Sequence, residues 1–205
     1  MTFKGPIPGP TDFISYVYHL RWHILAIVMI FIIFTALGYA VALAFPSFTE
    51  STISGFKEDV SPLKEMSAIG LMLGIFENNA IKCLIVVLLG LALGIAPIVF
   101  IIANGFIIGI IIGATMAKSG IIYVLVGIIP HGIIELPMVI ISSAIGLKLG
   151  IDVFKKLIRQ KANLRRDLKE AIMVFIFWIA PLLLIAAFME TFVTGTLLYL
   201  LFQHS

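Results

Sequence analysis

Long apolar stretches alternate with short polar segments along this chain, and the apolar stretches have the length of membrane-spanning helices. Crossing about 30 Å of hydrocarbon takes roughly 20 apolar residues in a helix. No Lys, Arg, Asp or Glu occurs from Cys83 to Ala117, which leaves room for two spans and a tight connection near Pro97. The pattern predicts about five spans, at residues 24–45, 80–96, 98–117, 121–147 and 171–190.

The largest polar segment before residue 148 lies between the first two predicted spans. Ser61 followed by Pro62 is typical of a helix start, and apolar residues then recur at helical spacing as far as Phe76. We expect an amphipathic helix here, lying along the membrane interface or leaning into the bundle. The apolar run from Thr191 to Phe202 is too short to cross alone and is expected to be re-entrant or interfacial.

The composition supports an all-α, polytopic transmembrane bundle in a single membrane-embedded domain, residues 1–205. The chain is 61% hydrophobic and 12% charged, whereas soluble domains carry about 25% charged residues. Its net charge of +3 is too small to indicate nucleic acid as a partner. The lone cysteine, Cys83, excludes an intramolecular disulfide and any CxxC motif.

A basic loop over residues 148–170 sets the predicted orientation. Lys and Arg outnumber acidic residues there, so the positive-inside rule places this loop in the cytoplasm. Counting spans outward puts the N-terminus in the cytoplasm and the C-terminus outside the cell membrane. Segment 46–79, where acidic residues outnumber basic ones, then lies outside.

The fourth predicted span contains polar and helix-breaking residues at membrane depth. Pro130, Gly132 and Pro137 predict a broken or kinked helix around His131 and Glu135. Titratable residues inside a membrane usually face a protein interior or a water-filled cavity. This stretch therefore predicts a site.

His131 and Glu135 lie four residues apart and so share one face of a helix. With Asn78, Asn104 and Glu190 they form a predicted polar core. One interpretation is a proton relay or ion-coordinating pair, because imidazole titrates near neutral pH. The other is an internally hydrogen-bonded pair that fixes the helix break, and the residues favour this second interpretation.

Signatures of enzyme chemistry are missing from the sequence. It has no Walker A loop, no GxGxxG with a ribose-binding acid and no GxSxG. A zinc hydrolase is disfavoured because there is no HExxH and only two ligands lie close in sequence, whereas catalytic zinc typically needs three. We expect no catalytic residues, no metal and no cofactor.

Glycines four residues apart predict close helix packing. Gly90 and Gly94 form one GxxxG, and Gly105, Gly109 and Gly113 form two more. Such stripes let membrane helices approach closely. Packing inside one subunit and packing between subunits remain open alternatives.

These residues together resemble the stage II sporulation protein M family. The resemblance rests on Phe76-Glu-Asn-Asn79, the spaced glycines, Asn104-Gly105, Pro130-His-Gly-Ile-Ile-Glu135-Leu-Pro, Ala144-Ile-Gly146 and Glu190, and it covers residues 15–200. It implies a five-span membrane protein. In spore formers the namesake acts as a membrane scaffold for cell-wall hydrolases, and relatives also occur in organisms without spores.

The resemblance and the residues together predict a non-enzymatic membrane scaffold or assembly partner. Its expected partners are the lipid bilayer and either other membrane proteins or further copies of itself. The alternative is a small transporter or permease that uses His131 and Glu135 in its pathway.

Overall fold

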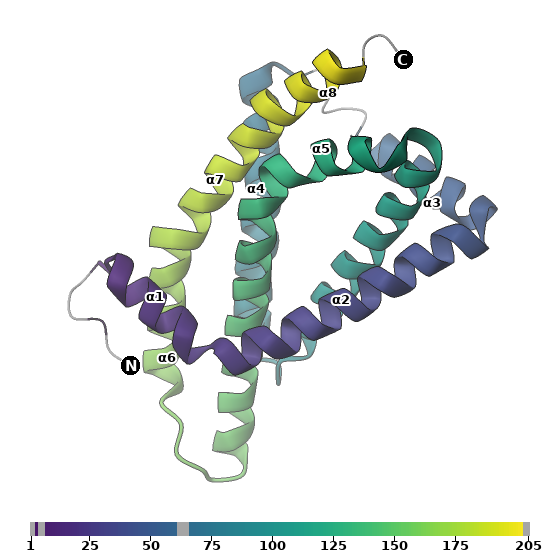
Figure 1. The fold of residues 1–205 in the computed structure, drawn as a ribbon. Helices are drawn as coiled ribbons and strands as arrows, with labels where there is room; N and C mark the ends of the chain where they lie inside the picture. The colour runs from purple at the N-terminus through teal and green to yellow at the C-terminus, as the bar shows by residue number, and fades with distance from the viewer. Residues whose placement is uncertain (1–2, 4–6, 61–65, 203–205) are drawn as a thin grey trace.

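The computed structural model describes residues 3, 7–60 and 66–202, and every regular element among them is helical (Figure 1). In chain order the elements are α1 (Pro10–His19), α2 (Arg21–Ala44), α3 (Pro46–Val60), α4 (Ala68–Leu89), α5 (Ile95–Leu157), α6 (Leu164–Val174), the π-helix η2 (Phe175–Ile179), α7 (Ala180–Phe188), the π-helix η3 (Met189–Thr194) and α8 (Gly195–Phe202).

Four helical segments of the described chain are long and apolar enough to cross a membrane. They are α2, α4, α5 and the continuous run from α6 to η3 at Leu164–Thr194. The predicted all-helical fold, with several helices long and apolar enough to span a membrane, is therefore confirmed. The number of spans stays a prediction, because α5 alone covers 63 residues.

α5 changes direction and so contains two limbs. A straight helix of its length would measure about 95 Å, three times the thickness of the hydrocarbon core. At Gly120 the backbone takes φ 80° and ψ 173°, a conformation open to glycine but strained for other residues. We call residues 95–119 the first limb and residues 121–157 the second limb.

The predicted helix break at Pro130, Gly132 and Pro137 is not confirmed. These residues stay inside the helix, and the one departure from helical angles within α5 is at Gly120. Figure 1 shows the second limb running across the top of the fold before it turns down beside α4. A proline removes one backbone hydrogen bond and can kink a helix without ending it.

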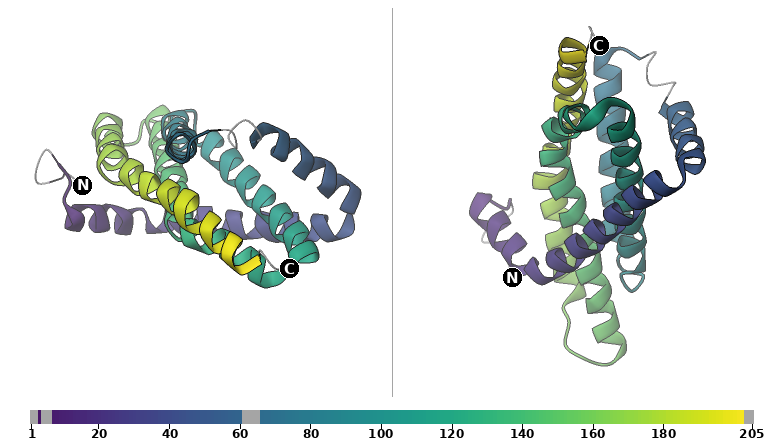
Figure 2. Two further views of the ribbon diagram at one scale, coloured as in Figure 1. Left: turned by 90° about the horizontal axis from the view of Figure 1, so that it is seen from above. Right: turned by 45° about the vertical axis from the view of Figure 1, so that its right-hand side comes forward.

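The helices fall into two groups (Figures 1 and 2). α2 packs lengthwise on the first limb, and we call these two elements the helix pair. α4, the second limb and the run from α6 to η3 pack on one another, and we call them the bundle. α5 belongs to both groups and joins them.

Glycines allow the close helix contacts in both groups. A Cβ at Gly109 would overlap the backbone oxygen of Thr35 in α2, and one at Gly113 would lie 2.6 Å from the Ala42 Cβ. Gly105 likewise faces Phe31 of α2. Gly90 and Gly94 lie against the second limb at Gly146 and Leu147. All five predicted packing glycines thus lie at contacts within one chain.

The boundaries differ from those predicted at the start of the bundle. The α4–α5 turn runs through Gly90 to Gly94, where Gly94 has φ 75°, and Pro97 is buried in the first turn of α5. The predicted helix start at Ser61 lies outside the described residues. Residues 68–76, expected in a separate interfacial helix, form the first part of α4, which is capped by Ser67.

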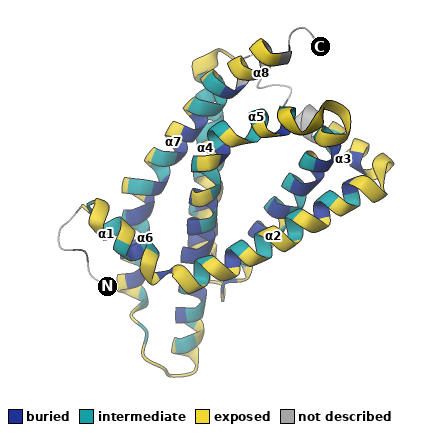
Figure 3. Cartoon of the chain, in the orientation of Figure 1, coloured by how far each residue is buried: buried dark blue, intermediate teal, exposed yellow. Residues whose placement is uncertain are grey.

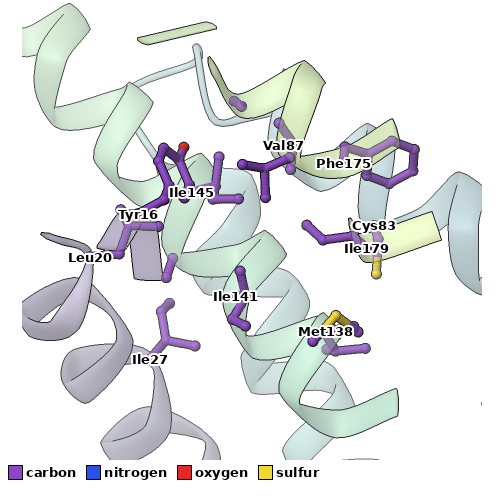
Figure 4. Packing of buried hydrophobic residues seen from close by; sticks show 14 of the residues in the cluster. Tyr16, Leu20, Ile27, Cys83, Val87, Met138, Ile141, Ile145, Phe175 and Ile179 are labelled. Atoms are coloured by element: carbon purple, nitrogen blue, oxygen red, sulfur yellow. The ribbon is translucent and has the colours of Figure 1, made fainter. Parts of the chain in front are cut away.

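The buried core lies in the lower half of the bundle, where α1 and α2 meet it (Figures 3 and 4). Tyr16 and Leu20 pack near Ile145 of the second limb, and Cys83 of α4 packs near Ile179. Much of α2 is exposed instead, as expected for a lipid-facing helix. The core fixes one end of the bundle.

Candidate functional site

Two segments that are distant in sequence bring His131, Glu135 and Glu190 together. One ligand atom from each residue, a ring nitrogen or a carboxylate oxygen, lies within 4.8 Å of the others. All three residues are half-buried. We call them the upper cluster, because η3, which supplies Glu190, directly precedes α8 at the top of the view in Figure 1.

The second limb supplies two members of the upper cluster. His131 and Glu135 are four residues apart in a continuous helix, so both side chains project from the same face. Gly132 is buried beside His131, where an added Cβ would lie 3.3 Å from the Ile128 side chain. The sequence spacing alone predicted this pairing.

The π-helix η3 supplies Glu190 and a hydrogen-bond partner for His131. The Thr194 hydroxyl lies 3.4 Å from Nδ1 of His131 and also donates to the Met189 backbone oxygen at 3.4 Å. Thr194 is only 6% exposed. Short π-helical turns inside α-helices occur frequently at functional sites. Sequence reasoning missed Thr194, and the signal available was only its place four residues after Glu190.

Asn104 and Asn78 do not join the upper cluster by any hydrogen bond among the described residues. Asn104 lies in the first limb, where its Nδ2 donates to the Phe100 oxygen of the same helix at 2.8 Å. Asn78 is exposed on α4. The structure therefore assembles three of the five predicted polar-core residues.

The upper cluster contains two carboxylates without an ion-paired cation in the described part of the chain. Lys82 of α4 is near enough to act on Glu135 through space, but it is exposed and is in none of the ion pairs formed among the described residues. Carboxylates held this close in a membrane protein repel each other unless a proton or a cation lies between them. The arrangement can therefore bind a proton or a positive ion.

A second group of charges lies at the opposite end of the bundle, and we call it the base cluster. Lys148 contacts Asp152 at 2.7 Å and Asp167 at 3.2 Å, and so joins α5 to α6. Arg166 contacts Asp167 at 3.2 Å and Glu170 at 4.0 Å. The three acids are each about 7% exposed or less. Sequence analysis had treated them only as charges of a cytoplasmic loop.

The N-terminal helix α1 packs over the base cluster. Tyr16 is buried, and burial together with the carboxylates of Glu170 and Asp167 raises the pKa of its phenol above the ordinary value. The indole of Trp178 donates to the Pro8 oxygen at 2.9 Å and its ring stacks on Phe13. These contacts connect α1 to the bundle.

A partly open, mainly apolar pocket of about 150 Å³ lies between the two limbs of α5. Gly127 and Ile128 line it, one helical turn before His131. The other lining residues are Ile111, Ile112, Thr115, Tyr123 and Val124. None of the three residues of the upper cluster lines the pocket.

One face of α4 is exposed along its length and mixes apolar with polar side chains. Ile81 and Ile85 are 47% and 46% exposed, and Glu77, Asn78 and Lys82 are exposed beside them. We call this the α4 face. Charged side chains on the outside of a membrane-spanning helix are costly unless water or another protein contacts them.

Comparison with known proteins gives a family and two archaeal relatives. The sequence profile of the family described as "Stage II sporulation protein M" matches residues 26–195. Two uncharacterized proteins of Methanocaldococcus jannaschii are similar to the chain. One is 30% identical over 57% of this chain and 67% of its own length, and the other is 27% identical over 88% and 81%. No solved structure matches the chain.

Proposed function

Because the chain belongs to the stage II sporulation protein M family, we propose that it is a non-enzymatic scaffold or assembly partner within the cell membrane. The α4 face carries this proposal. It presents Glu77, Asn78 and Lys82 from a helix long enough to span the bilayer. A neighbouring membrane helix with polar side chains can bond to these groups where lipid cannot.

The glycine stripes do not provide the assembly surface. Gly105, Gly109 and Gly113 are covered by α2, and Gly90 and Gly94 by the second limb. The partner therefore binds α4, as a second copy of the chain or as another membrane protein.

The proposed topology has five spans, with α5 crossing twice and the base cluster in the cytoplasm. Lys148, Lys155 and Arg166 surround the base cluster, and further basic residues follow Leu157 in the connection to α6. The positive-inside rule then places the N-terminus in the cytoplasm and the C-terminus outside. The upper cluster lies toward the outer leaflet, about 20 Å from Lys148 along the second limb.

Cysteine crosslinking in native membranes tests the assembly surface. In a Cys83→Ser background, a cysteine replacing Ile81 on the α4 face should give a defined crosslinked product of one size. The matched control is a cysteine replacing Ile32 of α2, which is equally apolar and 55% exposed. Mass spectrometry of the product would show whether the partner is a second copy.

The scaffold proposal fails if both positions crosslink alike or not at all and the purified protein stays monomeric in mild detergent. Glu77→Gln and Lys82→Met should weaken the crosslink at position 81, since both change the polar part of the α4 face. Light scattering in detergent would measure the mass of the complex independently.

A second candidate function is a small transporter or permease, favoured by the pocket between the limbs. Its wall reaches within one helical turn of His131, so an ion could pass from the pocket to the upper cluster. Proton or ion flux into proteoliposomes that is lost on Glu135→Gln would support transport. Flux unchanged by Glu135→Gln and by His131→Ala would remove these residues from any pathway.

A further inference from the structure

We infer that His131, Glu135 and Glu190 bind one divalent transition-metal ion, with zinc as the reference ion. The inference goes beyond the scaffold function and does not depend on it. Sequence analysis rejected zinc because only two ligands lie close together in sequence. The fold brings in Glu190 as the third ligand, from η3.

The donor set matches the chemistry of zinc and similar ions. Zinc binds imidazole nitrogen and carboxylate oxygen at about 2.0–2.2 Å, and open sites use three protein ligands. Ligands of one tetrahedral ion then lie about 3.4 Å apart. The three ligand atoms here lie within 4.8 Å of one another. Small side-chain rotations of the two glutamates and the histidine would bring the ligand atoms from this separation to about 3.4 Å.

Thr194 can set the tautomer of His131 for metal binding. When the Thr194 hydroxyl donates to the Met189 carbonyl oxygen, 3.4 Å away, its oxygen is free to accept from Nδ1–H of His131, also at 3.4 Å. The Nε2 lone pair of His131 then stays available for an ion. Metal-binding histidines almost always donate their other ring N–H to such a partner. Thr194 is buried, which keeps this hydrogen bond away from competing contacts.

The charge of the upper cluster also favours a dication. Two carboxylates carry up to two negative charges, and no described Lys or Arg forms an ion pair with either. A divalent ion neutralises both, which a membrane interior strongly favours. A shared proton is the competing occupant, and it would exclude metal.

Metal content of the untagged protein in lipid nanodiscs tests the inference. After chelator treatment and equilibration with buffered zinc, the wild type should retain one zinc per chain by mass spectrometry. Cobalt should give the visible absorption of a low-coordinate Co²⁺ site. Glu190→Gln should lose the stoichiometric ion, whereas Glu50→Gln, which removes an exposed glutamate of α3, should keep it.

Thr194→Val provides a second test if Glu190→Gln fails to fold. It removes the hydroxyl but retains the shape of the side chain, so affinity for zinc should fall about 10- to 100-fold. Three results would each overturn the site: wild-type protein without bound zinc, Glu190→Gln with as much zinc as Glu50→Gln, or Thr194→Val with unchanged affinity for zinc. None of these results bears on crosslinking at the α4 face, so the two proposals fail separately.

Discussion

The upper cluster and the base cluster lie about 20 Å apart on the same helix, but their charges are arranged differently. At the base, Asp152, Asp167 and Glu170 contact Lys148, Lys155 and Arg166, so three carboxylates meet three cations. At the top, two glutamates and a histidine meet no paired cation within the described chain. The carboxylates of the base cluster are paired with cations of the same chain. Those of the upper cluster can bind a proton or a cation from the surroundings.

This difference indicates which cluster is structural. Buried ion pairs hold elements in place when every charge has a partner, and the base cluster joins α5 to α6 in this way. Two neighbouring carboxylates without a cationic partner instead repel each other. Such arrangements are common at ligand-binding and ion-binding sites. The upper cluster, whose carboxylates have no paired cation, is therefore the candidate ion site, and the base cluster is the structural one.

The largest expected effect comes from removing Lys148. Lys148→Met leaves Asp152 and Asp167 buried with fewer positive partners, which should lower the free energy of unfolding by about 3 kcal/mol. Unfolding in detergent can be followed by a thiol-reactive dye, because the lone cysteine, Cys83, is buried in the folded protein. Lys156→Met, at an exposed position one turn from Asp152, is the control and should change little. Equal stability of the two variants would mean that the base cluster does not hold the fold.

A smaller effect should follow when the upper cluster receives its own cation. His131→Lys places an ammonium group beside Glu135 and Glu190, so zinc should no longer stabilise the protein. Zinc at about 100 times its dissociation constant should stabilise the wild type by about 2.7 kcal/mol. Thermal unfolding by intrinsic tryptophan fluorescence measures this, and His19→Lys, at an exposed histidine of α1, should behave as the wild type. If zinc still stabilised His131→Lys, zinc would not be binding at the upper cluster.

The smallest expected effect concerns Tyr16 above the base cluster. Its pKa is raised in the folded state, so above about pH 10 the unfolded chain loses a proton that the folded chain retains. Stability should therefore fall as pH rises, by at most about 1.4 kcal/mol per pH unit from this residue. For Tyr16→Phe, the free energy of unfolding should fall less steeply with pH above pH 10 than it does for the wild type. At neutral pH the two proteins should have nearly the same stability. Identical alkaline profiles would show that neither burial nor the base carboxylates raise the pKa of Tyr16 in the folded protein.

Local patterns in the sequence predicted the membrane-spanning helices and the pairing of His131 with Glu135. Both follow from hydrophobicity or from helical periodicity, which can be read from residues close together in the sequence. Pro97 was misleading as a sign of a turn, because proline also fits the first turn of a helix, where the structure places it. Gly90 and Gly94 make the turn instead.

Features set by distant contacts could not be predicted. Glu190 was predicted in the polar core, but Thr194 was not, because the sequence does not reveal the π-helical turn η3 that brings Thr194 to His131. Asn104 looked like a core residue, but a short amide in a helix can bond to its own backbone, as it does with Phe100. Asp167 is buried only because α6 folds back against Lys148.

The use of two distant segments for the upper cluster has a consequence for biosynthesis. Glu190 follows Glu135 by 55 positions, so at about 5–20 residues per second the ribosome adds it about 3 to 11 s later. His131 and Glu135 enter the membrane as an incomplete pair and wait for the last span. Metal capture is then a final step of membrane insertion, and a chain truncated before η3 would be released without its ion.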